Sequence, residues 1–289
     1  MLEKKLIQNI RSVKKTEQDI VTQDEIQVIP GMNERIRRLR EESVSTPATL
    51  SIERALIETS FYRKNEGKYS TPMMRAMNFM EICEKKYIYI GKDELIVGER
   101  GEKPKSVSTF PELTCHSVED LKVLNTREQQ RYLICEEDIE TYKREVIPYW
   151  TGRSQRERIF SRVPEEWKVA YEAGLFTEFM EQRAPGHTCL DGKIYRKGML
   201  DFKKEIEDSI NKLDYFNDPK ATDKEEQLRA MSLSCDALIR LGERHAEKSE
   251  ELARHEDNPQ RKEELLQIAK VCRRVPAHAP RNFMEAIQM

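Results

Sequence analysis

Apolar residues recur at three- and four-residue spacing along most of the chain, and this spacing places them on one face of an α-helix. Such stripes run through residues 52–59 and 73–83, and again through 202–213, 228–238 and 265–272. Polar and charged residues fill many of the intervening positions, as expected for helices with one buried face. The periodicity therefore predicts a mainly α-helical protein whose amphipathic helices pack against one another.

One stretch departs from this pattern. Residues 86–101, KYIYIGKDELIVGERG, contain two short runs of β-branched and aromatic residues on either side of a Gly-Lys-Asp turn. Residues of these types favour strands, and the turn between them favours a reversal of the chain. We therefore predict a short β-hairpin near 86–101.

Three helix starts carry capping signals. Ser117 stands three residues before Asp120, Thr222 stands three before Glu225, and Asn258 directly precedes Pro259. A short polar side chain accepts a hydrogen bond from the free backbone N–H groups of a first turn, where proline is also tolerated. We expect helices to begin at these three places.

Charge and composition limit the classes of molecule that the chain is expected to bind. The 289 residues carry 50 Lys and Arg and 52 Asp and Glu side chains, for a formal net charge of −2. This balance argues against nucleic acid as a partner, because phosphate binding needs a basic surplus. No stretch approaches the roughly 18 apolar residues of a membrane span, and the N-terminus lacks the apolar core of a secretion signal. We expect a cytoplasmic protein without a membrane partner.

The first residues differ from the rest of the chain. Residues 1–31 form a mixed-charge lead, and the first well-patterned helix opens at Met32. We predict an N-terminal extension at 1–31, followed by one domain at 32–289.

Side chains that are able to do chemistry are few. The six cysteines are scattered without a Cys-x-x-Cys pair, and the five histidines lack the spacing of metal ligands. Neither a zinc site nor a disulfide framework is indicated. Cys115 and His116 are adjacent, but neighbours in sequence rarely face each other as a catalytic thiol and its base must. We expect no metal site.

His187 is the strongest candidate for a functional side chain. It follows Pro185-Gly186 in the stretch FTEFMEQRAPGHT, where the helical pattern breaks. Glycine lets the backbone approach other groups closely, which is how loops deliver a polar side chain to a buried site. The residues alone leave open an ordinary surface histidine between two helices, and they leave Phe179 as either a core residue or a ligand contact.

Six segments together resemble the N-terminal part of the glycyl radical enzymes of the pyruvate formate-lyase superfamily. In chain order they are LSIERALIETSFY, DELIVGERG, FPELTCHSVEDL, IPYW, PEEWKVAYEAGLFTEFMEQRAPGHT and VPAHAPRNFMEAIQM. The similarity runs from about Met32 to the last residue, and FTEFMEQRAPGHT points to the hydroxyproline dehydratase branch. The resemblance implies that 32–289 is the helical N-terminal region of the α/β barrel of these enzymes.

The resemblance also implies a radical dehydration. An activating enzyme that uses S-adenosylmethionine would place a radical on a glycine, and the radical would pass to a cysteine. The full-length enzyme, expected to be a homodimer, would then remove water from trans-4-hydroxy-L-proline to give pyrroline-5-carboxylate. By the resemblance, His187 lies near the departing hydroxyl and Phe179 lines the same pocket, so both are expected to bind substrate.

The chain also departs from the family. It contains neither the Gly-Cys-x-Glu segment of the thiyl cysteine nor the Arg-Val-x-Gly-Tyr-like segment of the radical glycine. Cys135 and Glu137 stand two apart, but far too early in the family's order to be the catalytic pair. We therefore expect a portion that is truncated before the catalytic residues, binds no cofactor and is inactive alone. Two other functions stay open: another glycyl radical lyase, such as a formate acetyltransferase, diol dehydratase or choline lyase, and a noncatalytic helical scaffold derived from one.

Overall fold

The structure is a computed structural model that describes residues 33–176 and 191–289. The chain divides into two compact units, Met1–Thr46 and Pro47–Met289. The predicted boundary between residues 31 and 32 lies outside the described residues, so it stays a prediction.

In the first unit, the described residues form helix α2, Glu34–Ser45. The Asn33 side chain begins this helix by accepting a hydrogen bond from a backbone N–H of the first turn at 3.0 Å. Arg37 pairs with Glu34 at 2.6 Å and with Glu41 at 2.7 Å along one side of the helix. These exposed pairs support the helix only weakly, because water and salt screen them.

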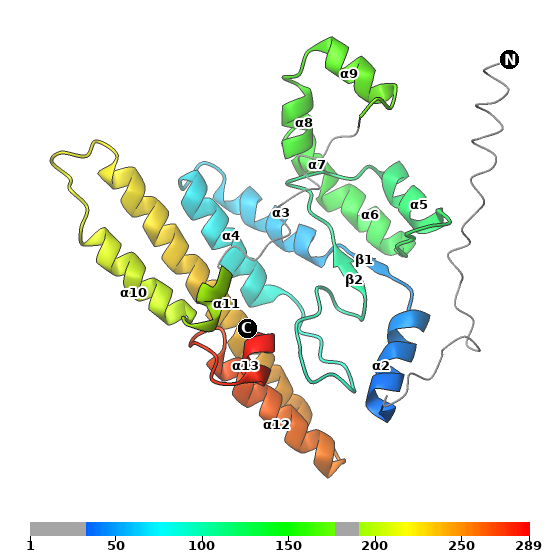
Figure 1. Ribbon diagram of the computed structural model, residues 1–289. Helices are drawn as coiled ribbons and strands as arrows, with labels where there is room; N and C mark the ends of the chain where they lie inside the picture. Colours follow the sequence, from blue (N-terminus) through cyan, green and yellow to red (C-terminus); the bar gives the residue numbers. More distant parts are fainter. Residues whose placement is uncertain (1–32, 177–190) are drawn as a thin grey trace, which may run out of the picture. The chain divides into compact units, whose positions relative to one another are not determined.

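The second unit is mainly helical, which confirms the fold class that the periodicity predicts (Figure 1). Its described elements, in chain order, are β1 (Thr49–Ser51), α3 (Glu53–Asn65), α4 (Thr71–Lys85), β2 (Ser106–Ser108), α5 (Val118–Thr126), α6 (Glu136–Glu145), α7 (Ile147–Trp150), α8 (Gln155–Phe160), α9 (Glu165–Glu172), the 3-10 helix η2 (Asp191–Tyr195), α10 (Met199–Ile210), α11 (Ala221–Arg254), α12 (Pro259–Arg274) and α13 (Phe283–Gln288). Strands β1 and β2 form a parallel pair in which Leu50 lies opposite Val107.

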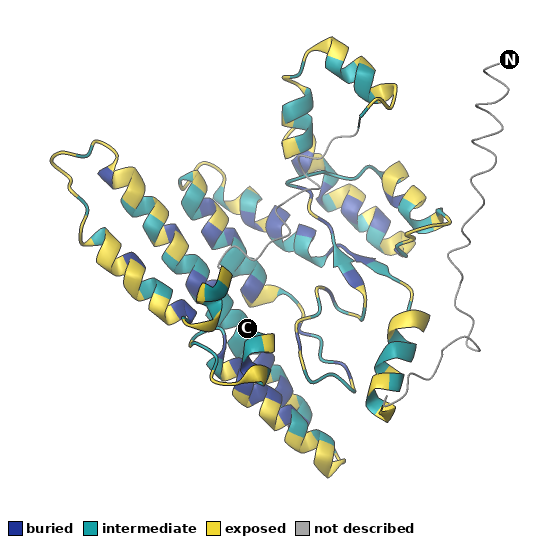
Figure 2. Ribbon diagram, in the orientation of Figure 1, coloured by how far each residue is buried: buried dark blue, intermediate teal, exposed yellow. Residues whose placement is uncertain are grey.

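Helix α11, which is 34 residues long, packs against α4, α10 and α12. Buried residues form a stripe along α11 and another along α12, while their other faces are exposed (Figure 2). The cluster that joins the C-terminal part of α11 to α12 consists of Val97, Ala246, Ala253, Leu265, Ile268, Ala269 and Cys272. Small alanines on α11 leave room for the larger Leu265 and Ile268 of α12, so the two helices interlock.

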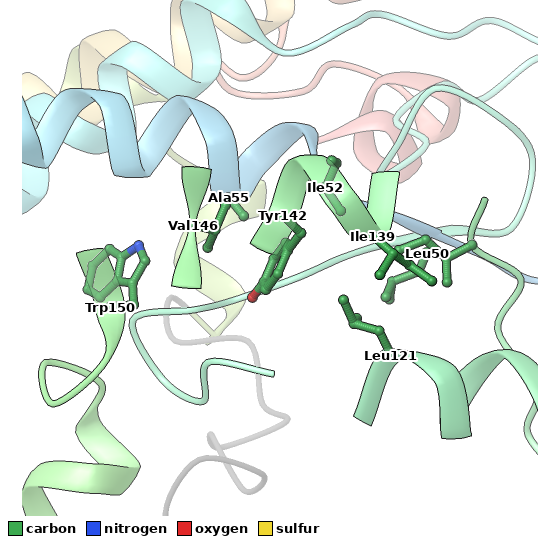
Figure 3. Close-up of a cluster of buried hydrophobic side chains, with 9 residues drawn as sticks. Leu50, Ile52, Ala55, Leu121, Ile139, Tyr142, Val146 and Trp150 are labelled. Carbon is green, nitrogen blue, oxygen red and sulfur yellow. The ribbon is translucent and has the colours of Figure 1, made fainter. Parts of the chain in front are cut away.

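A second hydrophobic cluster joins α3, α5, α6, α7 and β1 (Figure 3). Its buried residues are Leu50, Ile52, Ala55, Leu121, Ile134, Ile139, Tyr142, Val146 and Trp150. The indole N–H of Trp150 donates to the Thr59 hydroxyl at 2.8 Å, so this buried polar group has a partner. The short helices α5 to α7 are thus fixed on α3.

The predicted β-hairpin at 86–101 is wrong. None of these residues belongs to a strand, and the described strands β1 and β2 lie on either side of this range in the sequence. A strand forms where its backbone groups find a partner strand. In this segment, side chains from surrounding helices bind the backbone groups instead.

Arginines of α11 and α12 bind the carbonyl groups of this segment. Arg244 of α11 donates to the Lys86 carbonyl oxygen at 2.8 Å. Arg261 of α12 donates to the carbonyl oxygens of Gly91 and Glu94, both at 2.8 Å. Buried backbone groups need partners, and these contacts supply them without a sheet.

The side-chain amide of Gln288, in the last turn of α13, binds both backbone groups of Val97. Its oxygen accepts from the Val97 N–H at 2.9 Å, and its nitrogen donates to the Val97 carbonyl oxygen at 2.8 Å. A neighbouring strand would supply the same pair of hydrogen bonds. The Glu53 carboxylate of α3 accepts from the Tyr87 N–H at 2.7 Å. Four helices therefore hold the segment in an irregular conformation.

Candidate functional site

Both predicted substrate-binding residues, His187 and Phe179, lie outside the residues that the structure describes. Their roles stay predictions. The structure does describe the chain on either side of residues 177–190, and those flanking residues show how the chain enters and leaves this stretch.

Before this stretch, α8 and α9 carry an aromatic cluster. Trp167 and Tyr171, one turn apart on α9, stack with ring centroids 5.7 Å apart and planes inclined by 7°. Phe160 of α8 meets both rings edge-on, and Phe176 packs against Trp167 with centroids 4.8 Å apart. The Arg156 guanidinium lies 4.4 Å from the Phe160 ring centroid. Edge-to-face and cation–π contacts each add to the stability of such a cluster, which fixes the chain up to Phe176.

After this stretch, the first turn of α10 is bound to residues 276–278. The Met199 N–H donates to the Pro276 carbonyl oxygen at 2.8 Å. The Leu200 N–H donates to the Ala277 carbonyl oxygen at 3.0 Å. A helix leaves its first N–H groups without partners inside the helix, so these carbonyls cap α10.

Gly198 makes this close approach possible. A Cβ atom at Gly198 would lie 2.3 Å from the Ala277 carbonyl oxygen and 2.4 Å from the Cα atom of His278. Real side chains do not tolerate such distances to backbone atoms, so any larger residue would push the two segments apart. The C-terminal flank of 177–190 is therefore held at one point by backbone contacts.

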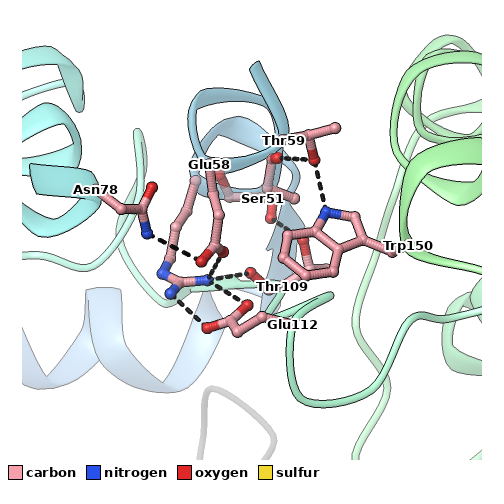
Figure 4. A network of polar contacts seen from close by, with 9 residues as sticks. Ser51, Glu58, Thr59, Asn78, Thr109, Glu112 and Trp150 are labelled. Carbon is pink, nitrogen blue, oxygen red and sulfur yellow. Dashed lines mark hydrogen bonds and ion pairs between the residues drawn. The ribbon is translucent and has the colours of Figure 1, made fainter. Parts of the chain in front are cut away.

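A buried polar network joins α3, α4 and the residues before α5 (Figure 4). The Arg54 guanidinium donates to Glu58 at 2.8 Å, and to the two carboxylate oxygens of Glu112 at 3.0 and 2.6 Å. The Asn78 amide donates to Glu58 at 3.0 Å. The Phe110 ring covers the guanidinium, with its centroid 4.2 Å from the guanidinium carbon. The network thus fixes three separate parts of the chain.

Sequence reasoning missed this network. The helical stripe at 52–59 indicated a buried face through Ala55 and Thr59, and Glu58 lies on that same face. Hydrophobic periodicity does not identify a buried carboxylate. The available signal was Arg54, which stands four residues before Glu58 and so lies beside it on a helix.

Three of the described cysteines, Cys83, Cys115 and Cys272, are not poised as nucleophiles. Burial raises the pKa of Cys83 and Cys115 to about 11, and that of Cys272 to about 12. These thiols are therefore protonated at neutral pH, whereas the thiolate is the reactive form. The Cys115 thiol faces the backbone carbonyl of His116 at 3.9 Å, and burial lowers the pKa of the His116 ring.

Within residues 33–176 and 191–289, no group of three or more His, Cys, Asp and Glu side chains is arranged to hold a metal ion. No helix in these residues is both long and apolar enough to cross a membrane. Cys135 is exposed and precedes α6, and Glu137 lies in the first turn of that helix.

The family model for pyruvate formate lyase-like proteins matches residues 32–289. The chain belongs to the pyruvate formate lyase-like family. The match includes every described element of the second unit, and it agrees with the resemblance seen in the sequence.

The sequence identity to curated members of this family differs from one relative to another. A trans-4-hydroxy-L-proline dehydratase from Clostridioides difficile is 45% identical over 90% of this chain and 33% of the relative. An isethionate sulfite-lyase from Nitratidesulfovibrio vulgaris is 29% identical over 89% of this chain and 32% of the relative. The chain therefore spans about one third of the length of these curated relatives.

Solved structures of family members agree with this fold. The structure of hydroxyproline dehydratase from Clostridioides difficile with trans-4-hydroxy-L-proline bound matches with a TM-score of 0.85 at 45% identity, covering 90% of this chain and 33% of that chain. The glycerol-bound B12-independent glycerol dehydratase from Clostridium butyricum matches with a TM-score of 0.83 at 31% identity, covering 91% of this chain and 34% of that chain.

The segments that carry the family resemblance also contact one another. Arg54 belongs to the first of them and binds Glu112 of the third. Gln288 belongs to the last and binds Val97 of the second. Hydrogen bonds therefore join segments of the family pattern that lie far apart in the sequence.

Proposed function

We propose that this chain is the N-terminal portion of a glycyl radical dehydratase that removes water from trans-4-hydroxy-L-proline and gives pyrroline-5-carboxylate. One observation carries the proposal: the 45% identity to trans-4-hydroxy-L-proline dehydratase over 90% of the chain. Family members that act on other substrates are more distant, with 29% identity for an isethionate sulfite-lyase and 26% for a sulfopropanediol dehydratase.

In this proposal, the chain forms one wall of the substrate site. His187 lies near the departing 4-hydroxyl, where an imidazole can hydrogen-bond the oxygen and pass it a proton. Phe179 contributes an apolar surface that excludes water from the same pocket. The aromatic cluster of α8 and α9 and the contacts of Gly198 support this role, because they fix the chain on both sides of residues 177–190.

The radical steps belong to residues outside the 289. Neither a Gly-Cys-x-Glu segment nor an Arg-Val-x-Gly-Tyr-like segment occurs in the sequence. We therefore assign the glycyl radical, the thiyl cysteine and its glutamate to the remainder of an α/β barrel, of which residues 32–289 form the helical N-terminal region. An activating enzyme that uses S-adenosylmethionine, a homodimeric assembly and a cytoplasmic location complete the proposal. The 289 residues alone catalyse nothing.

An anaerobic assay of the polypeptide encoded by the complete reading frame, with its activating enzyme, tests this function. The substrates are trans-4-hydroxy-L-proline, glycerol, 1,2-propanediol and isethionate, each offered to the same preparation. We expect pyrroline-5-carboxylate from the first and little turnover of the others. Preference for another substrate would support a different glycyl radical lyase, and no turnover of any, with no glycyl radical in the electron paramagnetic resonance spectrum, would support the scaffold.

The role of His187 is tested in the same assay. Loss of a positioned acid or base typically lowers turnover by about 10²–10⁴-fold, so we expect a decrease in this range for His187→Ala. His255→Ala is the matched control, since His255 is an exposed histidine on the described surface. If the two variants were equally active, His187 would have no role in the substrate site, and the proposed dehydratase function would still stand.

A further inference from the structure

Two carboxylates converge on one guanidinium. Nη1 of Arg54 donates to Glu58 Oε2 at 2.8 Å and to Glu112 Oε2 at 3.0 Å, and Nη2 donates to Glu112 Oε1 at 2.6 Å. Among residues 33–176 and 191–289, Arg54 is the one cation within ion-pair distance of either carboxylate. With both glutamates ionised, two negative charges would face a single positive charge.

The cluster is shielded from water. Glu58 is 1% exposed, and the side chains of Arg54 and Glu112 are 19% and 25% exposed. An uncompensated buried charge is costly, and a carboxylate relieves the cost by binding a proton. Burial, and then the hydrogen bond and charge of Glu112, raise the pKa of Glu58 to about 8.

The remaining groups around Glu58 do not neutralise the extra charge. Helix α4 contributes the Asn78 amide, which is neutral. The same helix as Glu58 contributes Tyr62, whose pKa is raised to about 12 by burial and by the charges of Glu58 and Glu112. The positive charge of Arg75, on α4, lowers the pKa of Tyr62. Arg75 makes no ion pair with Glu58 among the described contacts.

Asn78 provides a second observation. Its Oδ1 atom is buried and has no hydrogen-bond partner within the described part of the chain, while its Nδ2 atom donates to Glu58 Oε1. The two ends of an amide are nearly isosteric, so a rotated Asn78 would turn its oxygen toward Glu58. That oxygen would accept a hydrogen bond from a protonated Glu58. Asn78 can therefore hydrogen-bond Glu58 in either protonation state of the carboxyl group.

We propose that Glu58 and Glu112 hold one proton between them in the folded protein, and that release of this proton to solvent loosens residues 109–114 from α3. Glu58 is fixed within a helix, whereas Glu112 belongs to a non-helical segment and is partly exposed. Repulsion between two ionised carboxylates therefore moves Glu112. Arg54 also donates to the Thr109 carbonyl oxygen at 3.4 Å, so the same guanidinium holds two points of this segment. The device is independent of the reaction proposed above.

The shared proton can be observed directly. Glutamate carrying ¹³C at its carboxyl carbon is incorporated into the protein, and the carboxyl signals are followed by NMR as the pH is raised. We expect one signal with a midpoint near pH 8, absent in Glu58→Gln and shifted to lower pH in Glu112→Gln. Glu250→Gln, which removes a partly exposed carboxylate paired with Arg273, should leave it unchanged. Titration of every glutamate in the ordinary acidic range would overturn the proposal.

Hydrogen exchange tests the loosening. Above the midpoint, amides in residues 109–114 of the unmodified protein should exchange faster than in Glu58→Gln, which resembles the protonated acid at every pH. Each pKa unit by which the shared proton stabilises the closed form corresponds to about a tenfold change in opening. Comparing the two proteins at the same pH removes the intrinsic effect of pH on exchange. Equal exchange above the midpoint would overturn the proposal, and Glu112→Gln repeats the comparison if Glu58→Gln does not fold.

Discussion

The Gln288 side chain makes the two backbone hydrogen bonds to Val97 that a neighbouring β-strand would otherwise make. Its amide satisfies both the N–H and the carbonyl of Val97, and no charge is involved. A buried backbone N–H or carbonyl that loses its hydrogen-bond partner is still kept away from water. The free energy of removing it from water is then no longer offset by a hydrogen bond. Single side chains of this kind therefore determine the conformation of a segment whose own residues favour a different one.

We predict that Gln288→Ala lowers the free energy of unfolding by about 1–3 kcal/mol, because it leaves two part-buried backbone groups of Val97 unpaired. Urea denaturation measures the loss. Gln260→Ala is the control: Gln260 is an exposed glutamine on α12, and its replacement should change stability by less than about 0.5 kcal/mol. Equal losses in the two variants would contradict the role of Gln288.

Local signals at single residues were predictable from the sequence. Ser117 accepts from the Asp120 N–H at 3.1 Å and Asp120 accepts from the Ser117 N–H at 2.8 Å. Asn258 accepts from the first turn of α12 at 2.9 Å. These two predicted helix starts are therefore confirmed, since a cap depends only on residues a few positions away. The predicted capping box of Thr222 and Glu225 is wrong, because α11 begins at Ala221 and no side chain caps its first turn. The burial of Glu58 depends on a partner, Glu112, that is distant in sequence, so periodicity could not reveal it.

At the scale of elements, helix periodicity was a reliable guide and strand propensity was not. A helix satisfies its own backbone, whereas a strand needs a partner. The β-forming residues at 86–101 meet arginines of α11 and α12 rather than a strand. Nothing within 86–101 indicates those arginines, so the irregular conformation could not be read from the segment itself.

The contact between α10 and residues 276–278 gives a prediction at this scale. Gly198→Ala places a methyl group 2.3 Å from the Ala277 carbonyl oxygen, so the two elements must separate. We expect a loss of about 1–3 kcal/mol in unfolding free energy, as for other overpacked sites. Gly192→Ala is the control, because its Cβ would meet only the Arg196 side chain, at 3.4 Å. A thermal or urea denaturation that does not separate the two variants would contradict the close approach.

At the scale of the whole molecule, buried groups of opposite kind act on the stability at opposite ends of the pH range. Burial lowers the pKa of His116 and His245. The unfolded chain then binds protons that the folded chain does not, so stability is lost as the pH falls below about 6.5, the ordinary pKa of histidine. Glu58 has a raised pKa, so its contribution is complete below about pH 4.5 and is lost as the pH rises from there to about 8.

We therefore predict that the free energy of unfolding is greatest near pH ~6.5 and declines on both sides. Urea denaturation at a series of pH values measures this profile. Glu58→Gln should abolish the decline between about pH 6.5 and 8 and steepen the acid side, because it removes the proton that the folded chain retains. Above about pH 8.5 the buried cysteines lower the stability of both proteins. A decline between about pH 6.5 and 8 that persists in this variant would assign that decline to other groups.

Family membership was also predictable from the sequence, because it rests on segments spread over most of the chain, and the match to residues 32–289 confirms it. The site residues are a different matter. His187 and Phe179 come from the resemblance alone and lie outside the described residues, so they stay predictions. The described structure adds what the resemblance did not contain: the flanking contacts and the buried network of Arg54.

The way in which residues 86–101 are held has a consequence for the order of folding. Their partners lie on α3, α11, α12 and α13, so the segment has no stable conformation until those helices have packed. Contacts between residues so far apart in sequence carry a large loop-closure cost and form late. Substitutions at Arg244 or Arg261 should therefore accelerate unfolding and leave the folding rate nearly unchanged, because the contacts they remove are absent from the transition state.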